Sequence, residues 1–208
     1  MHIYDLKYIS ILPYKMMLKK IIKLFRNVVC LIGLISISPL IIIVGSIIII
    51  EDGFPIFFIQ ERVGLDKVSF NIIKIRTLKK NTPNIGTHEL KDSNMLKNGK
   101  WIRKIKLDEF PQLINVLKGE LNIVGPRPGL VTQEKLLKER SLKNIFMVKP
   151  GITGLAQILG YDMSDPKKLA EIDEAYIINR SIALDFLIIA GTFFNFPKQN
   201  LKNRFKIC

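Results

Sequence analysis

Hydrophobic residues dominate the first quarter of the chain. Residues 28–50 form a run of 23 residues without a charged side chain, and residues 15–26 before it are basic and amphipathic. At about 1.5 Å per residue, such a run is long enough to cross the roughly 30 Å hydrocarbon core of a bilayer. The charged pair Glu51-Asp52 follows, where a cleaved secretory signal would carry small residues. The pattern therefore predicts a retained membrane helix.

Pro39 divides this apolar run into two arms of 11 residues, with Ser36 and Ser38 just before it. A proline frees a backbone group inside a helix, and nearby hydroxyl groups can satisfy it. Six basic residues and one acidic residue precede the run, and 26 basic and 15 acidic residues follow from Gly53 onward, so both flanks have the positive bias of cytoplasmic segments. Two interpretations remain open: a helix that breaks at Ser38-Pro39 and returns to the same face, or a single crossing with a proline kink.

A β-hairpin is predicted next. Residues 56–63 and 68–77 are rich in β-branched and aromatic residues, and a Gly-containing segment, 64–67, separates them. In the second strand Lys74 and Arg76 share a face and lie about 7 Å apart. They are either a pair of binding cations or solvated charges that protect a strand edge.

The most informative stretch is residues 107–129, LDEFPQLINVLKGELNIVGPRPG. Its apolar spacing predicts a helix that ends at Lys118-Gly119, with the adjacent acids Asp108 and Glu109 at its N-terminus. A short strand and a rigid turn follow, and the turn holds Arg127 between two prolines. In the simplest interpretation Asp108 is a helix cap, Glu109 interacts with the helix dipole and Arg127 is a surface charge.

The surroundings of the acid pair favour chemistry instead. A basic helical stretch, residues 99–106, brings Arg103 close to Asp108 and Glu109. Such cations are expected to depress the pKa values of both acids and to keep them ionised. Adjacent carboxylates among cations suit phosphoryl transfer, in which a carboxylate holds a divalent metal or acts as the nucleophile.

The remaining pattern predicts surface and interfacial helices. Residues 131–144 read as a surface helix, residues 148–161 as an elaborate Gly/Pro-rich loop, and Asp165 starts a further helix. Residues 182–196 are strongly apolar but too short to span a membrane, so they lie at the membrane surface or against the core. Asp185 within them needs a partner.

These elements predict a mostly helical α+β fold. Residues 1–52 form the amphipathic segment and membrane helix, residues 53–197 form a small cytoplasmic domain, and residues 198–208 form a basic tail. The net charge of +14 indicates an anionic partner, which is nucleic acid, acidic lipid or a phosphorylated substrate. The two cysteines and two histidines lack metal-ligand spacing. A membrane-tethered basic binding protein is the rival function, but with a single Trp no platform for stacking bases is visible, and we expect no nucleic-acid partner.

Several stretches together resemble the bacterial sugar transferase family, the small monotopic polyprenyl-phosphate phosphoglycosyl transferases. They occur in the family's order and cover nearly the whole chain from about Lys20 to Phe196. These stretches are Ser38-Pro39, FFIQERVG (57–64), KIRT (74–77), LDEFPQLINVLKGE (107–120), VGPRP (124–128), KPGITGLAQ (149–157) and NRSIALD (179–185).

This resemblance implies a re-entrant membrane helix-break-helix hairpin at Ser38-Pro39 and an active site on the cytoplasmic face of the bacterial inner membrane. The implied reaction transfers a sugar 1-phosphate from a UDP-sugar to undecaprenyl phosphate and releases UMP, with Mg²⁺ as cofactor. Membrane lipid is an expected partner, and homodimers or complexes with downstream glycosyltransferases are compatible with the family.

The resemblance also implies residue roles. Asp108 matches the nucleophile that forms a covalent phospho-sugar enzyme, and Glu109 matches its partner; both are expected metal ligands. Lys74 and Asp185 fall on further positions of the catalytic site. Arg127 and Arg103 fall on family positions too, and with Lys74 they are expected to bind phosphate, with Asp185 positioning these three cations. Arg76, which shares a strand face with Lys74, is a further expected phosphate-binding residue.

Two departures from the family pattern stand out. The residues before the acid pair are Ile105-Lys106, where many members carry Thr-Ser. After the GITG segment the chain has Leu159-Gly160-Tyr161, where many members have Asn-Gly-Arg. The loss of that arginine bears on contacts to the sugar or the nucleotide.

Overall fold

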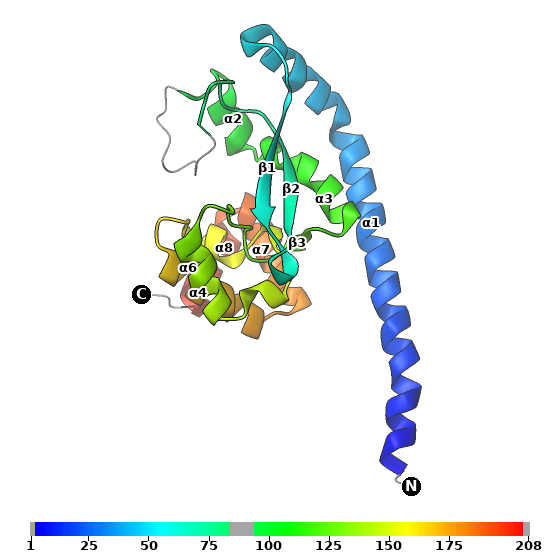
Figure 1. Ribbon diagram of the computed structural model, residues 1–208. Helices are drawn as coiled ribbons and strands as arrows, with labels where there is room; N and C mark the ends of the chain where they lie inside the picture. Colours follow the sequence, from blue (N-terminus) through cyan, green and yellow to red (C-terminus); the bar gives the residue numbers. More distant parts are fainter. Residues whose placement is uncertain (1–2, 84–93, 206–208) are drawn as a thin grey trace.

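The computed structural model describes residues 3–83 and 94–205 of the chain, and the side chains of residue 17 and of residues 20 onward within them. Residues 84–93, in the polar stretch 79–98 that is expected to be mostly loop, lie outside the described residues, as do the end of the predicted tail 198–208 and the side chains of Lys15 and Lys19. A long helix, α1, runs beside a small domain of two short sheets and several helices (Figure 1). The predicted mostly helical α+β fold is confirmed.

Helix α1 spans Ile3–Asp52 without interruption. Its part from Lys20 to Asp52 is long and apolar enough to cross a membrane. The predicted break at Ser38-Pro39 is not seen, because the helix continues through both residues. Pro39 lacks the N–H that would bond to the Ile35 carbonyl four residues earlier. The Ser38 hydroxyl donates to that same carbonyl at 2.8 Å. The freed group is therefore satisfied, and the helix bends instead of ending (Figure 1).

The predicted β-hairpin is present. Strands β1 (Phe57–Val63) and β2 (Ser69–Ile75) pair antiparallel, with Phe58 opposite Lys74. A 3-10 turn, η1 (Leu65–Lys67), joins them. A second sheet pairs two short strands in parallel, β3 (Asn122–Val124) and β4 (Gly151–Thr153). The strand β4 and helix α5 (Leu155–Leu159) occupy the segment predicted as a loop, so that prediction was wrong over most of its length.

Helices surround the two sheets. Between the sheets in sequence lie α2 (Gly99–Lys104), the 3-10 helix η4 (Leu107–Gln112) and α3 (Leu113–Lys118). The predicted surface helix is α4 (Glu134–Leu142), followed by η5 (Ile145–Met147). The C-terminal helices are α6 (Pro166–Ile178), α7 (Ile182–Phe193) and α8 (Asn195–Phe205). The boundary predicted between residues 197 and 198 falls inside α8.

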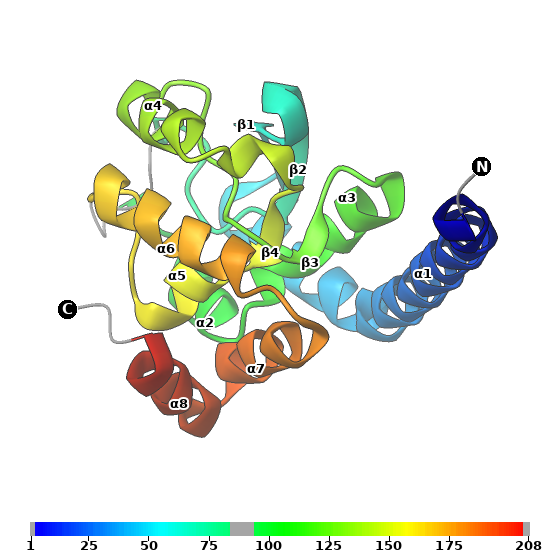
Figure 2. The same ribbon diagram turned by 90° about the horizontal axis from the view of Figure 1, so that it is seen from below.

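Two apolar clusters attach α1 to the domain. Near its C-terminal end Val44 and Ile48 pack with Ile75, Ile102 and Leu107 of the domain. Cys30, further toward the N-terminus, packs in a second cluster with Ile72 of β2, Val116 of α3 and Leu121. Figure 2 shows α1 along one side of the domain, next to α3. The domain therefore touches α1 over much of the length of its apolar run.

The third cluster forms the core beneath the C-terminal helices. Leu184 and Ile188 of α7 are fully buried in it, whereas Ile182, Phe186 and Phe193 on the opposite side of the same helix are exposed. The segment 182–196 thus contributes to the core through one face of α7, as predicted, and exposes an apolar surface on the opposite face.

Candidate active site

The acid pair lies in the 3-10 helix η4, not at the start of an α-helix as predicted. Lys106, with φ of +61°, turns the chain from α2 into η4, and α3 begins only at Leu113. Neither Asp108 nor Glu109 caps α3. Leu107 is buried against α1, so it fixes the turn in place and the next two side chains point toward a cavity.

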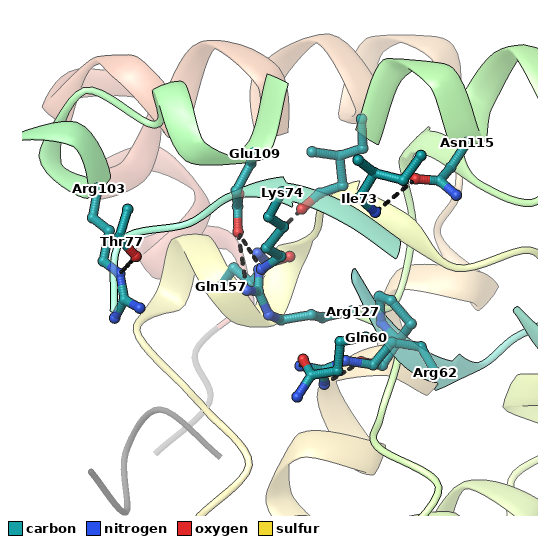
Figure 3. A network of polar contacts seen from close by, with 12 residues as sticks. Gln60, Arg62, Ile73, Lys74, Thr77, Arg103, Glu109, Asn115, Arg127 and Gln157 are labelled. Atoms are coloured by element: carbon teal, nitrogen blue, oxygen red, sulfur yellow. Dashed lines mark hydrogen bonds and ion pairs between the residues drawn. The ribbon is translucent and has the colours of Figure 1, made fainter. Parts of the chain in front are cut away.

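Glu109 is held by two cations from distant parts of the chain (Figure 3). Its Oε1 accepts from Arg127 Nη2 at 2.9 Å and from Lys74 Nζ at 3.4 Å. Burial alone would raise the pKa of Glu109, but the positive charges of Arg127, Lys74 and Lys106 outweigh it and hold this pKa at about 2. Glu109 is therefore ionised at neutral pH, as the sequence predicted.

Asp108 differs from its neighbour. It is 8% exposed, and among residues 3–83 and 94–205 its carboxylate accepts no hydrogen bond. Burial and the negative charge of Glu109 raise the pKa of Asp108, against the opposing effect of Lys74 and Arg103. The prediction that cations depress both pKa values was therefore wrong for Asp108. A carboxylate with unused acceptors at the edge of a cavity is available to a substrate.

The cations expected around the acid pair are present. Burial and the charge of Arg127 lower the pKa of Lys74 to about 8, although Glu109 opposes this effect. Arg103 lines the same cavity, and its Nε donates to the Thr77 hydroxyl at 2.8 Å. Lys74, Arg103 and Arg127 thus come from β2, α2 and a turn to one place.

Arg76 does not point with Lys74 as predicted. It follows the end of β2 and is 5% exposed. Its guanidinium forms an ion pair with Asp52 at the end of α1 and donates to the carbonyls of Gly53, Pro55 and Leu78. With its donors used in this way, Arg76 anchors the end of the membrane helix, although one edge of it reaches the cavity.

Asp185 lies apart from the acid pair. Its carboxylate accepts from the Tyr176 hydroxyl at 2.7 Å and pairs with Arg180 at 3.8 Å. Asp185 is not among the described residues that line the cavity, and it contacts none of the cations among them. The expectation that Asp185 positions the phosphate-binding cations is therefore corrected: its partners are on α6 and in the turn that follows.

Sequence reasoning missed Arg62. This residue is buried, and its Nη1 donates to the Pro128 carbonyl at 3.1 Å while Nη2 donates to Gln60 Oε1 (Figure 3). Burial and the charge of Arg127 lower the pKa of Arg62 to about 9. A signal was available, because Phe58, Gln60 and Arg62 alternate along β1 and so share a face.

The cavity in front of the acid pair has a volume of about 580 Å³, within the range of small-molecule sites. Of the described residues that line it, eight are basic and three are acidic. The basic residues are Arg62, Lys74, Arg76, Lys79, Lys80, Arg103, Lys106 and Arg127, and the acidic residues are Asp108, Glu109 and Asp162. The segment that departs from the family pattern, Gly160-Tyr161, also lines it. Such a cavity suits a ligand with several negative charges.

The acid pair can contribute to a metal site only together with a ligand. In the described part of the chain no three His, Cys, Asp or Glu side chains cluster around a common point. The available oxygens are the Asp108 carboxylate and Glu109 Oε2, since Oε1 takes both cations. Mg²⁺ commonly binds one or two carboxylates and completes its shell with substrate phosphates and water, so these residues fit that ion.

Comparison with known proteins gives a consistent answer. The profile of the family described as bacterial sugar transferase matches residues 14–199. The chain is 39% identical over 155 residues to an uncharacterised sugar transferase, EpsL, of Bacillus subtilis (strain 168). The aligned stretch covers 74% of this chain and 76% of that protein.

Two longer relatives carry descriptive names. The chain is 36% identical to the UDP-N-acetylgalactosamine-undecaprenyl-phosphate N-acetylgalactosaminephosphotransferase of Aeromonas hydrophila, over 74% of this chain and 38% of that protein. It is 37% identical to the UDP-glucose:undecaprenyl-phosphate glucose-1-phosphate transferase of Klebsiella pneumoniae, over 77% of this chain and 37% of that protein. The chain spans less than half the length of these two relatives. The match to the family profile and to EpsL covers most of the sequence, and the chain belongs to the bacterial sugar transferase family.

Proposed function

We propose that this protein transfers a sugar 1-phosphate from a UDP-sugar to undecaprenyl phosphate and releases UMP. The observation that carries the proposal is Asp108, a nearly buried carboxylate without a hydrogen-bond partner in the described chain, at the wall of a cation-rich cavity. The names of the relatives support the general reaction.

The chemistry proceeds in two displacements. An oxygen of Asp108 attacks the phosphorus that bears the sugar, and the P–O bond to UMP breaks, so that UMP leaves with the bonding electrons. The enzyme then carries an aspartyl phospho-sugar. A phosphate oxygen of the polyprenyl acceptor attacks the same phosphorus, the bond to Asp108 breaks, and the carboxylate is restored.

The cations assist both steps electrostatically. Lys74 and Arg127 form ion pairs with Glu109 and also line the cavity. They can therefore neutralise negative charge that develops on the transferring phosphoryl group. Arg103, held by Thr77, is placed for a further phosphate oxygen. Glu109 keeps Lys74 and Arg127 in position, because it is ionised and contacts both.

We include Mg²⁺ in this proposal. Asp108 and Glu109 Oε2 would hold it, together with oxygens of the diphosphate. When bound, the ion neutralises phosphate charge and makes UMP a better leaving group. Binding of Mn²⁺, a spectroscopic substitute, is expected in the presence of UDP and is expected to weaken in Glu109→Gln.

We further propose that α1 enters the cytoplasmic leaflet of the inner membrane and returns to the same face, with its bend at Pro39. The packing of α1 supports this topology. Its contacts to the domain extend from Cys30 to Ile48, about 27 Å along the helix axis. A perpendicular crossing over residues 28–50 would carry this contact and the charged domain to hydrocarbon depth, where polar groups are costly.

The decisive experiment measures UMP release. The full chain is reconstituted in lipid with undecaprenyl phosphate, and a panel of UDP-sugars is tested with wild type and Asp108→Asn. We expect one or a few donors to release UMP and to label wild type covalently with sugar phosphate, and neither signal in Asp108→Asn. A basic binding protein without catalysis would instead bind anions in a salt-sensitive way and be indifferent to this substitution.

The topology has its own test. Single cysteines are placed at Asn27 and at Phe54, which is 67% exposed, on the two flanks of the apolar run, in chains whose natural cysteines are replaced. Modification of both from the cytoplasmic side supports the re-entrant arrangement. Modification from opposite sides would establish a single crossing.

A further inference from the structure

The turn that carries Arg127 depends on donors from elsewhere. Pro126 and Pro128 have no N–H, so the turn offers few bonds of its own. Each carbonyl from residue 126 to residue 129 instead accepts a hydrogen bond from a distant residue. The donors are the backbone of Gly151, the side chain of Arg140, the side chain of Arg62 and the backbone of Val63, in that order.

Arg140 is the donor to the Arg127 carbonyl itself. Its Nη1 lies 2.7 Å from that oxygen. Its other donors face Asp173 on α6, where Oδ2 accepts from Nε at 3.0 Å and from Nη2 at 2.6 Å. The side chains are 2% and 4% exposed. Two bonds to one carboxylate fix the plane of a guanidinium and hence the direction of its remaining donor.

This arrangement exceeds what joining two helices requires. A buried ion pair often contributes little to stability compared with apolar residues of the same size, because desolvation offsets the attraction. Lys143, the residue directly after α4, already forms a surface ion pair with Glu174 of α6, at 2.5 Å. What distinguishes Arg140 is its third hydrogen bond, which it donates to the backbone carbonyl of Arg127, outside the two helices. The side chain of Arg127 in turn contacts Glu109.

We propose that Arg140 and Asp173 are a positioning pair for Arg127: they fix its backbone so that its guanidinium reaches both Glu109 and the phosphates of the donor nucleotide. This inference rests on the function proposed above, which identifies the ligand of Arg127 as the donor nucleotide. Neither residue lines the cavity, so their effect passes through Arg127.

The test is a double-mutant cycle on the full chain in lipid. Arg140→Lys is the first variant, because it keeps a buried cation beside Asp173 but lacks the fork that bonds both partners at once. Arg140→Met/Asp173→Leu is the second, since replacing both ends leaves no unpaired buried charge. The matched control is Lys143→Met/Glu174→Gln between the same helices. Each is made with and without Arg127→Met.

Two quantities are measured, kcat/KM for UMP release and the Kd of UDP, with the Tm of every variant recorded separately. With Arg127 present, we expect Arg140→Lys to lower kcat/KM and to weaken UDP binding by about tenfold, the range seen when an outer support is removed. In the Arg127→Met background, Arg140→Lys should alter kcat/KM and the Kd of UDP by less than about twofold. If Arg140 acts only through Arg127, its substitution has little left to change once Arg127 is gone. The control should change neither quantity in either background.

Equal losses with and without Arg127 would overturn the proposal and leave the pair a purely structural one. An undiminished UDP affinity in Arg140→Lys and in the Arg140→Met/Asp173→Leu chain would overturn it as well. If wild type binds UDP but releases no UMP from any donor, the proposed reaction fails while the cycle in UDP affinity still decides the role of the pair. A wild type that binds no UDP refutes both.

Discussion

The two sides of η4 face regions of opposite character. Leu107 points toward α1 into a contact of apolar side chains, among them Val44 and Ile48, which are 1% exposed. Asp108 and Glu109 point the other way, into a cavity with more basic than acidic side chains. The central side chains of the first region are buried and apolar, so this region offers no site for a polar ligand. The second has an excess of positive charge and an unused carboxylate, which an anionic ligand would balance.

The contrast between these two regions shows how the acid pair is kept in position. One residue of η4 is fixed by packing against the membrane helix, and the next two are thereby held at a fixed height over the cavity. Packing contributes rigidity and the cavity contributes reactivity. Substitutions in the cavity should therefore reduce catalysis without loss of stability, and substitutions in the α1 contact should do the reverse.

The largest expected effect is that of Asp108→Asn. The amide cannot attack phosphorus, so we expect UMP release to fall by at least about a thousandfold, as for other nucleophile removals. The Tm should not fall, because the substitution relieves a buried carboxylate next to Glu109. UMP release and thermal unfolding on the same sample measure both. A rate within tenfold of wild type would remove Asp108 from the nucleophile's role.

Lys74→Met comes next. Its side chain is 15% exposed and its ammonium lies close to Glu109, so we expect the rate to fall by about a hundredfold, the size of an electrostatic contribution inside a site. Stability should hold, because Arg127 still pairs with Glu109 and a desolvated cation is replaced by an apolar side chain. Lys104 is exposed on α2, and Lys104→Met is the control that should leave the rate unchanged. A large drop in the Tm of Lys74→Met would mean that the cavity cluster stabilises the fold.

Ile48→Ala tests the other region. The side chain is 1% exposed, so its truncation should lower the free energy of unfolding by about 2 kcal/mol. Ile50→Ala, two residues on and 86% exposed, should change it by less than about 0.5 kcal/mol. Denaturant unfolding in one lipid or detergent gives both values. A rate per folded molecule that falls in Ile48→Ala as steeply as in Lys74→Met would show that the two regions are not separable.

The sequence predicted much of this division. Period-two spacing located the hairpin, and the resemblance to the family placed Lys74, Arg103, Glu109 and Arg127 at one site. These signals are local or come from the family's motif set. The sign of the pKa shift at Asp108 was not predictable, because burial opposes the cations and burial depends on the packing of Leu107 against α1.

Long-range partners explain the other errors. Arg76 looked like a second binding cation, but the strand ends before it and its partner is Asp52, which no local pattern links to it. Asp185 was assigned to the cavity by resemblance, whereas Tyr176 and Arg180 hold it elsewhere. At Pro39 the local pattern predicted the freed carbonyl and the hydroxyl that compensates for it, but it left open whether the helix breaks or continues. The hydroxyl compensates well enough to keep the helix continuous.

That compensation gives the smallest predicted effect. Ser38→Ala leaves the Ile35 carbonyl without a donor, which should lower the free energy of unfolding by about 1 kcal/mol. In the Pro39→Ala background residue 39 regains an N–H that can bond to the same carbonyl, so Ser38→Ala should then cost less than about 0.3 kcal/mol. Unfolding of the four chains in one lipid composition measures the cycle. An equal cost in both backgrounds would mean that the hydroxyl does not replace the bond that Pro39 lacks, and that the continuity of α1 through this position has another cause.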